Sequence, residues 1–251
     1  MKFRRGTGGV SRPRLRLERA QRKAPDRWVL DKDQAHHLVH VRRCVEGDRV
    51  EGLLNGRLFL LKLAAEEGYL CGILEKELPA GPGKNLWLLL ALLKMDAFER
   101  SLRIATESGA GNIVPLFCER SVVRLDEKRW SSKQKRWTKI IEESTRQACV
   151  PQRPVLYEPL SVGSAMSLPL PENRYAAMLS KDAKLLVDCK PSGGAVFAVG
   201  PEGDWTRSEC ETLSGKGFTA VSLGRGIMRS PTAVAVGLGF LSMRLEQCYE
   251  N

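Results

Sequence analysis

The sequence has few histidines, and its cysteines lack the spacing of metal-binding or disulfide-bonded pairs. Its 251 residues include only three histidines and seven cysteines, and no two cysteines stand in a CxxC pair. An odd, scattered set of cysteines fits neither a disulfide framework nor a zinc ribbon. We therefore expect a protein of the reducing cytoplasm, without structural disulfides.

All three histidines lie close together, at His36, His37 and His40. They fall on a helix predicted over Asp33–Cys44, where spacings of three and four residues would let two of them share a metal ion. No neighbouring cysteine or carboxylate pattern supplies the remaining ligands that a metal usually needs. We expect a partly exposed helical turn and no metal site.

The sequence also lacks a long apolar run. The longest, Leu86–Leu93, is far shorter than the roughly 20 residues of a membrane-spanning helix. No charged start is followed by the apolar core of a signal peptide. These absences favour a soluble, cytoplasmic protein with no membrane partner.

Acidic residues are outnumbered, with 29 Asp and Glu against 40 Lys and Arg and a formal net charge of +11. Such an excess favours a polyanionic partner, and nucleic acid first among them. The stretch up to Val29 holds ten Lys and Arg but only Glu18 and Asp26 as acidic residues. We interpret it as a flexible basic arm, and an organellar transit peptide is the alternative.

A Pro/Gly cluster, Pro79-Ala80-Gly81-Pro82-Gly83, separates two stretches of different character. We predict one domain over residues 1–79, which includes the basic arm, and a second over residues 84–251. In the first, strands predicted at Arg49–Leu53 and Leu58–Leu63 flank Asn55-Gly56.

That dipeptide is typical of a type I′ hairpin turn. With a third strand around Tyr69–Leu74, the pattern predicts a small β-barrel.

After the cluster, the chain alternates between short apolar runs and segments with helical periodicity. The predicted strands are Leu86–Leu93, Ile113–Phe117, Tyr175–Leu179, Ala195–Val199 and Thr219–Leu223. The predicted helices run from Met95 to a stop at Gly109, from about Ser131 to Cys149, and over Pro231–Gln247. This order predicts an α/β domain with a mostly parallel sheet. The first strand runs into Lys94–Phe98 without a GxGxxG turn, which disfavours an ordinary Rossmann enzyme.

Ligands of open α/β sheets bind beyond the carboxyl ends of the strands, where two late loops stand out. The first loop, Gly200-Pro201-Glu202-Gly203-Asp204, has glycines that let backbone approach a ligand, and Thr206 with Glu209 predicts a helical capping box behind it. The second loop runs from Leu223 to Ser230. The first loop could also be a plain, tight strand-to-helix turn.

The second loop ends with Ser230 as the predicted N-cap of a helix and Pro231 as its first residue. Two arginines, Arg225 and Arg229, alternate there with glycines at the start of the helix. Backbone N–H groups at a helix N-terminus attract anions, so the loop can form an anion-binding concavity. Solvated surface charges are the alternative.

The two loops together are more specific than either alone. GPEG after one strand, followed about twenty residues later by LGxxIxR and Thr232-Ala233, resembles the SPOUT superfamily, and specifically the ribosomal RNA small-subunit methyltransferase E family. That family methylates N3 of a uridine in 16S rRNA. Further matching segments are His37, Val41, Arg43, Gly47-Asp48, Ala105–Gly109, Ile113, Pro115-Leu116, Glu119–Ser121, Arg136–Gln147 and Pro154. The chain departs from the family pattern at three positions: the family usually has a final glycine, in GPEGG, where this chain has Asp204, a Glu where it has Pro231, and an Arg where it has Val150.

The resemblance implies a trefoil-knotted C-terminal α/β domain, an exception to the rule that connections do not thread, and an N-terminal PUA-like β-barrel. It also implies S-adenosyl-L-methionine (AdoMet) as cofactor, a homodimer, and 16S rRNA within the small ribosomal subunit as partner. The implied AdoMet contacts are Leu179, Gly200, Glu202, Gly203, Leu223, Gly224, Ile227 and Met228. The implied RNA contacts are Arg43, Arg120 and Arg225.

For catalysis we expect Arg229 to stabilise the negative charge that develops on the uracil oxygens. No histidine lies beyond His40, so a general base would be a carboxylate such as Glu202, a group of the other subunit, or water. Two alternatives stay open. One is a SPOUT methyltransferase for another RNA position, such as a ribose 2′-oxygen, and the other is a non-catalytic RNA-binding or ribosome-assembly protein.

Overall fold

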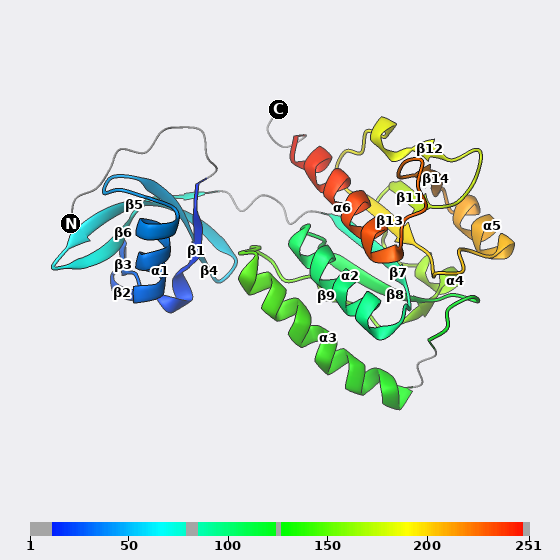
Figure 1. Ribbon diagram of the computed structural model, residues 1–251, viewed down its shortest axis with the longest axis horizontal. Coiled ribbons are helices and arrows are strands. Elements are labelled where there is room, and N and C mark those ends of the chain that lie inside the picture. Colours follow the sequence, from blue (N-terminus) through cyan, green and yellow to red (C-terminus); the bar gives the residue numbers. More distant parts are fainter. Residues whose placement is uncertain (1–11, 79–84, 124–126, 248–251) are drawn as a thin grey trace. The chain divides into compact units, whose positions relative to one another are not determined.

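The computed structural model describes residues 12–78, 85–123 and 127–247. The chain divides into two compact units, residues 1–80 and 81–251. The Pro/Gly cluster at residues 79–83 and the first 11 residues of the expected arm lie outside the described residues. Each unit is considered by itself below (Figure 1).

The N-terminal unit is built on a six-stranded sheet. In spatial order the strands are β1 (Arg14–Arg16), β4 (Arg49–Leu54), β5 (Arg57–Glu66), β6 (Tyr69–Leu78), β3 (Arg27–Val29) and β2 (Gln21–Ala24). β1 pairs with β4 in parallel, and the other pairs are antiparallel. In the β4–β5 turn Asn55 and Gly56 have φ values of 49° and 77°, as a type I′ turn requires. The three predicted strands and their hairpin are confirmed.

The prediction of a flexible arm up to Val29 is wrong for residues 12–29. This segment forms β1, a 3₁₀ turn over Leu17–Arg19, β2 and β3. The physical reason is apolar burial, because Leu15, Leu17 and Trp28 are 1–7% exposed within the core of the unit. Basic side chains of the segment pair with carboxylates of the same sheet, as in the 2.7 Å contact between Arg14 and Glu51.

The predicted helix over Asp33–Cys44 is shorter and changes type. α1 (Lys32–His36) starts at a capping box formed by Asp31 and Gln34, and one π-helical turn, His37–Val41, follows it. Leu38 is buried, whereas all three histidines are exposed. The rings of His36 and His40 stack with centroids 4.7 Å apart. Among the described residues, no cluster of three potential metal ligands occurs.

The C-terminal unit contains an eight-stranded sheet. Its strands are β7 (Leu86–Ala91), β8 (Asn112–Phe117), β9 (Val155–Leu156), β10 (Leu160–Ser161), β11 (Asn173–Ala177), β12 (Lys184–Leu185), β13 (Ala195–Val199) and β14 (Thr219–Ser222). The order is β10-β8-β7-β13-β11-β14-β12, β9 pairs with β8, and every pair is parallel. The predicted parallel α/β sheet is confirmed; the short strands β9, β10 and β12 were not predicted.

Helices pack on this sheet. They are α2 (Met95–Glu107), α3 (Glu127–Gln147), α4 (Val162–Ala165), α5 (Arg207–Gly215) and α6 (Ser230–Gln247), with a 3₁₀ turn at Leu186–Asp188. α2 contacts α3 and α6, and α6 lies on β7 and β13 (Figure 1). Gly237 lets α6 approach the sheet, because a Cβ there would stand 2.2 Å from the ring of Phe197. None of the helices seen in the described part of the chain has the length and apolarity to cross a membrane.

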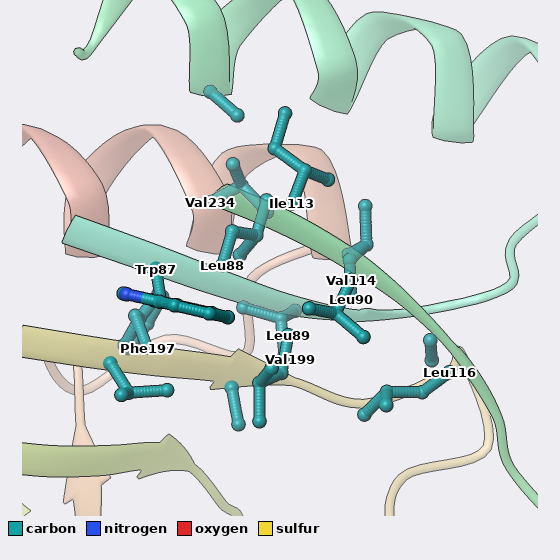
Figure 2. Packing of buried hydrophobic residues seen from close by; sticks show 14 of the residues in the cluster. Trp87, Leu88, Leu89, Leu90, Ile113, Val114, Leu116, Phe197, Val199 and Val234 are labelled. Carbon is teal, nitrogen blue, oxygen red and sulfur yellow. The ribbon is translucent and has the colours of Figure 1, made fainter. Parts of the chain in front are cut away.

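The core of the C-terminal unit is centred on β7 and β13. Every residue of β7 is buried, as expected for a strand covered on both faces. Figure 2 shows Leu88 and Leu90 packed among side chains of the neighbouring strands. Phe98 of α2 stacks on Trp137 of α3 with ring centroids 4.3 Å apart. This packing fixes the carboxyl ends of the central strands, from which the functional loops start.

Candidate active site

A cavity of about 780 Å³ opens at the carboxyl ends of β7, β11, β13 and β14. Its walls are the two loops singled out in the sequence, the end of β11 and the first turns of α2 and α6. This is the position at which ligands of parallel α/β sheets bind. The volume also falls within the range typical of small-molecule and cofactor sites.

The first loop, residues 200–204, follows β13 and forms a tight turn. The N–H of Asp204 donates to the carbonyl of Pro201 over 3.0 Å. Asp204 has a φ of 59°, in the left-handed region, and its carboxylate accepts a 2.9 Å hydrogen bond from the N–H of Trp205. Aspartate is one of the few residues besides glycine that tolerate this conformation. The chain therefore keeps the turn although Asp204 replaces the last glycine of the GPEGG pattern.

Thr206 and Glu209 form the predicted capping box at the start of α5. Oε2 of Glu209 accepts from the N–H of Thr206 at 2.8 Å, and Oε1 accepts from the N–H of Glu119 at 2.9 Å. One buried carboxylate thus links α5 to the segment after β8. Burial, together with the charge of Glu209, raises the pKa of the Cys118 thiol, so that cysteine is a neutral packing residue.

Arg120 reinforces the same link. Its Nη1 donates to the carbonyls of Gly203 at 2.9 Å and Trp205 at 3.2 Å. The predicted role of Arg120 is RNA contact, but these hydrogen bonds direct the guanidinium to the first loop. Gly203 is also close by, because a Cβ there would lie 3.2 Å from the Cβ of Arg120.

The second loop connects β14 to α6. Gly224 has a φ of 138°, which strongly favours glycine, and nothing lies within 4 Å of the position of a Cβ there. Ile227 is 81% exposed although it lines the cavity. Ser230 is the first residue of α6, one position before the predicted start, and its hydroxyl donates to the carbonyl of Gly200 at 3.2 Å. The two loops are therefore joined by a direct hydrogen bond.

The structure brings most of the predicted site residues together at this cavity. Nine of them line it: Leu179, Gly200, Glu202, Leu223, Gly224, Arg225, Ile227, Met228 and Arg229. Gly203 belongs to the first loop but does not line the cavity, and its carbonyl accepts a hydrogen bond from Arg120. Arg43 lies in the N-terminal unit, exposed and with a φ of 57°.

A further wall of the cavity was missed in the sequence. Lys94, Asp96 and Arg100 line it from the start of α2. The loop after β7 contains no glycine, yet its charged side chains follow a strand end just as the two glycine loops do. The cavity is therefore lined by apolar side chains and glycine backbone together with both cationic and acidic side chains.

Comparison with known proteins gives the family. Residues 81–242 match the RNA methyltransferase domain family, and residues 30–68 match the RNA methyltransferase PUA domain. Ribosomal RNA small subunit methyltransferase E of Synechocystis is 30% identical over 85% of this chain and 72% of its own length. The Bacillus subtilis protein of the same name is 26% identical over 92% of this chain and 96% of its own length.

The chain belongs to the ribosomal RNA small subunit methyltransferase E family. A solved structure supports the assignment: the family member from Neisseria gonorrhoeae, crystallised with S-adenosyl methionine, is 26% identical with a TM-score of 0.63, over 93% of this chain and 98% of that one. The expected combination of a PUA-like N-terminal domain and a parallel α/β C-terminal domain is thereby confirmed for this family member.

Proposed function

We propose that this protein transfers a methyl group from AdoMet to N3 of a uridine in 16S rRNA. The observation that carries the proposal is the cavity itself, in which two glycine loops of a methyltransferase domain meet cationic side chains. The relatives are named as small-subunit rRNA methyltransferases, and one of them was crystallised with this cofactor. The Pro/Gly segment at residues 79–83 would separate the RNA-binding domain from the catalytic one.

The residues of the cavity fit AdoMet. The open space beside Gly224 leaves its backbone accessible, and a side chain there would occupy that space. Leu179, Ile227 and Met228 offer apolar contacts for an adenine ring. Gly200 and Leu223 would add backbone contacts and Glu202 a carboxylate, whereas Gly203, which does not line the cavity, would contribute only to the shape of the first loop. When bound, AdoMet supplies an electrophilic methyl group on a positively charged sulfonium.

The chemistry requires the uracil ring to be held in line with that methyl group and N3 to lose its proton. Positioning alone can supply roughly 7 to 11 kcal/mol of the barrier. The new bond joins N3 to the methyl carbon, the carbon–sulfur bond breaks with its electrons remaining on sulfur, and the N3 proton goes to a base. The candidates for that base are Glu202, a group of the other subunit, or water, and we assign Arg229 as the group that stabilises negative charge on the uracil oxygens.

Arg229 is suited to this task by its place in the fold. It immediately precedes α6, and its carbonyl accepts the helical hydrogen bond from Ala233 at 2.9 Å, so its backbone is fixed. Its side chain is exposed and lines the cavity. Arg225, in the same loop, and Arg43, in the N-terminal unit, are the proposed phosphate contacts. Arg120 serves instead to hold the first loop.

We also propose a homodimer that uses the outer face of α6. From Ser230 to Met243 this helix has no charged residue. Val236 and Met243, seven residues apart on one face, are 40% and 59% exposed. A second copy of the chain would bury these side chains. Sedimentation should give a dimer for the native protein and a monomer for Val236→Glu/Met243→Glu. The trefoil knot and a cytoplasmic location, with the ribosomes, are part of the same proposal.

Two measurements test the function. Calorimetry should show stoichiometric AdoMet binding, and small subunits from a strain that lacks the gene should gain one N3-methyluridine when incubated with protein and AdoMet. Mass mapping of the nucleosides identifies the product. A methylated ribose 2′-oxygen would replace the proposed target by the first alternative, and absence of AdoMet binding would favour the non-catalytic RNA-binding protein.

A further inference from the structure

Trp205 stands directly behind the cavity and contacts two of its walls. Its side chain is buried, at 4% exposure, and does not itself line the cavity. The indole Nε1–H donates to the carbonyl of Ala177 at 2.9 Å. Ala177 is the last residue of β11 and immediately precedes Met178 and Leu179, which do line the cavity.

The same indole ring packs against the first loop. A Cβ on Gly200 would lie 3.0 Å from both Cε2 and Nε1 of Trp205, so only glycine lets the ring lie this close to the end of β13. The backbone of Trp205 is held as well, because its carbonyl accepts from Arg120 at 3.2 Å and its N–H donates to Asp204 at 2.9 Å. Trp205 is therefore held both by its backbone and by its indole N–H.

The connection extends to the second loop. The carbonyl of Gly200, beneath the indole, accepts the hydroxyl of Ser230 at 3.2 Å. Trp205, Gly200 and Ser230 thus join the ends of β11 and β13 to the start of α6. Each of these three elements contributes residues to the wall of the cavity.

We propose that Trp205 is a positioning residue for the cofactor. Its indole N–H holds the end of β11 in a fixed position relative to the first loop, so that the walls of the cavity are ordered before AdoMet binds. This inference rests on the proposed function. A site whose walls are already ordered binds its ligand without the entropic cost of ordering them. Losing the hydrogen bond lowers the fraction of protein in the binding-competent arrangement, and the apparent affinity falls by that fraction.

The test compares two Trp→Phe variants that each remove one indole hydrogen bond. Trp205→Phe deletes the bond to Ala177. Trp87→Phe is a matched control: Trp87 is also 4% exposed, and its Nε1–H donates to the side chain of Asn85 at 2.8 Å, just before the first residue of β7 and at the other end of the sheet. Both variants should lose similar thermal stability.

Only Trp205→Phe should weaken AdoMet binding, by about tenfold in Kd, the loss expected for one buried hydrogen bond. Its KM for AdoMet should rise similarly, with kcat at saturating AdoMet nearly unchanged. Without ligand, the amides of residues 200–206 should exchange hydrogen faster than in the native protein. Equal AdoMet affinity and equal amide exchange in Trp205→Phe and Trp87→Phe would refute the proposal.

A measurement on the native protein keeps the test independent of variant folding. The chain has five tryptophans, so an indole ¹⁵N spectrum resolves few signals, and single Trp→Phe changes at the other four assign that of Trp205. Saturating AdoMet should shift the indole N–H signal of Trp205 but not that of Trp87. An unshifted Trp205 signal at saturation would overturn the inference, whereas no AdoMet binding by the native protein would overturn the proposed function.

Discussion

Replacing Arg120 by methionine distinguishes a loop-positioning role from an RNA-binding one. Nη1 of Arg120 donates to two carbonyls, those of Gly203 and Trp205, at 2.9 and 3.2 Å. Hydrogen bonds from a charged group contribute roughly 1.5–3 kcal/mol, and the exposure of this side chain reduces the effect to about 1 kcal/mol. Methionine keeps most of the aliphatic stem but removes the donors. We expect AdoMet affinity to fall about fivefold, because the loop loses its fixed position.

An arginine that contacts RNA phosphate gives a different signature. Each neutralised phosphate contributes about 0.7–0.9 to the slope of log K against log salt concentration. Arg225 is the matched comparison, since it is exposed and lines the same cavity from the second loop. Arg225→Met should reduce the slope by about 0.7–0.9, the contribution of one phosphate contact, and leave the AdoMet Kd unchanged.

Arg120→Met should instead weaken AdoMet binding and leave the RNA salt slope unchanged. Its RNA affinity is measured at saturating AdoMet over a range of salt concentrations. The positioning role is refuted if Arg120→Met binds AdoMet normally and its RNA salt slope falls as it does in Arg225→Met. A loss of both affinities with a large drop in melting temperature would mean that the variant is unfolded. Arg120→Lys then provides the milder change, because a lysine reaches one carbonyl but lacks the planar fork.

Three further predictions concern the cavity and the N-terminal segment. Gly224→Val should abolish AdoMet binding in a folded protein. The control is Gly217→Val, which changes another open position with positive φ outside the cavity and should reduce only stability. Calorimetry measures the AdoMet binding of both variants, and thermal melts measure their stability. Arg229→Ala should lower single-turnover methylation about 100- to 1,000-fold with near-normal AdoMet affinity, and Arg229→Lys should recover it in part; a joint loss of stability, dimer and AdoMet binding would contradict the catalytic role. Deleting residues 1–11 should leave the fold intact and flatten the RNA salt slope, because the deletion removes three cations, Lys2, Arg4 and Arg5. Deleting residues 1–24 should instead unfold the N-terminal unit, because it also removes β1 and the buried Leu15 and Leu17. An unchanged slope after the shorter deletion would show that those residues do not contact RNA.

The sequence was a good guide where a local pattern determines the structure. Continuous apolar runs predicted β7 and β13, and Asn55-Gly56 predicted a hairpin turn whose two residues both have positive φ. The two glycine loops were placed correctly at strand ends, where the structure brings them together. These features depend on residues that are neighbours in the sequence, so a pattern can reveal them.

It was a poor guide where the partners are distant in the chain. The segment up to Val29 was predicted to be flexible because basic residues dominate it. Leu15, Leu17 and Trp28 lie scattered among those charges, and their burial depends on strands far along the sequence. Nothing near Arg120 indicated that its guanidinium bonds to carbonyls 83 and 85 positions away. Trp205 was overlooked for the same reason, because its hydrogen bond reaches back 28 positions to Ala177.

The departure from the family pattern at Asp204 shows how such distant contacts preserve a loop when a residue changes. A glycine takes the left-handed conformation without cost, whereas Asp204 holds it with a Cβ in place. Its carboxylate offsets part of that cost by accepting from the N–H of Trp205, and the Arg120 guanidinium binds the carbonyls of Gly203 and Trp205 on either side of it. The turn is therefore fixed by its surroundings rather than by the freedom of a glycine. Because Asp204 also lines the cavity, the change adds a second carboxylate, besides that of Glu202, to the wall formed by the first loop, whereas Arg225 and Arg229 line the cavity from the second loop. The backbone of the first loop is thus maintained, and the consequence of the substitution falls on the electrostatics of the cavity.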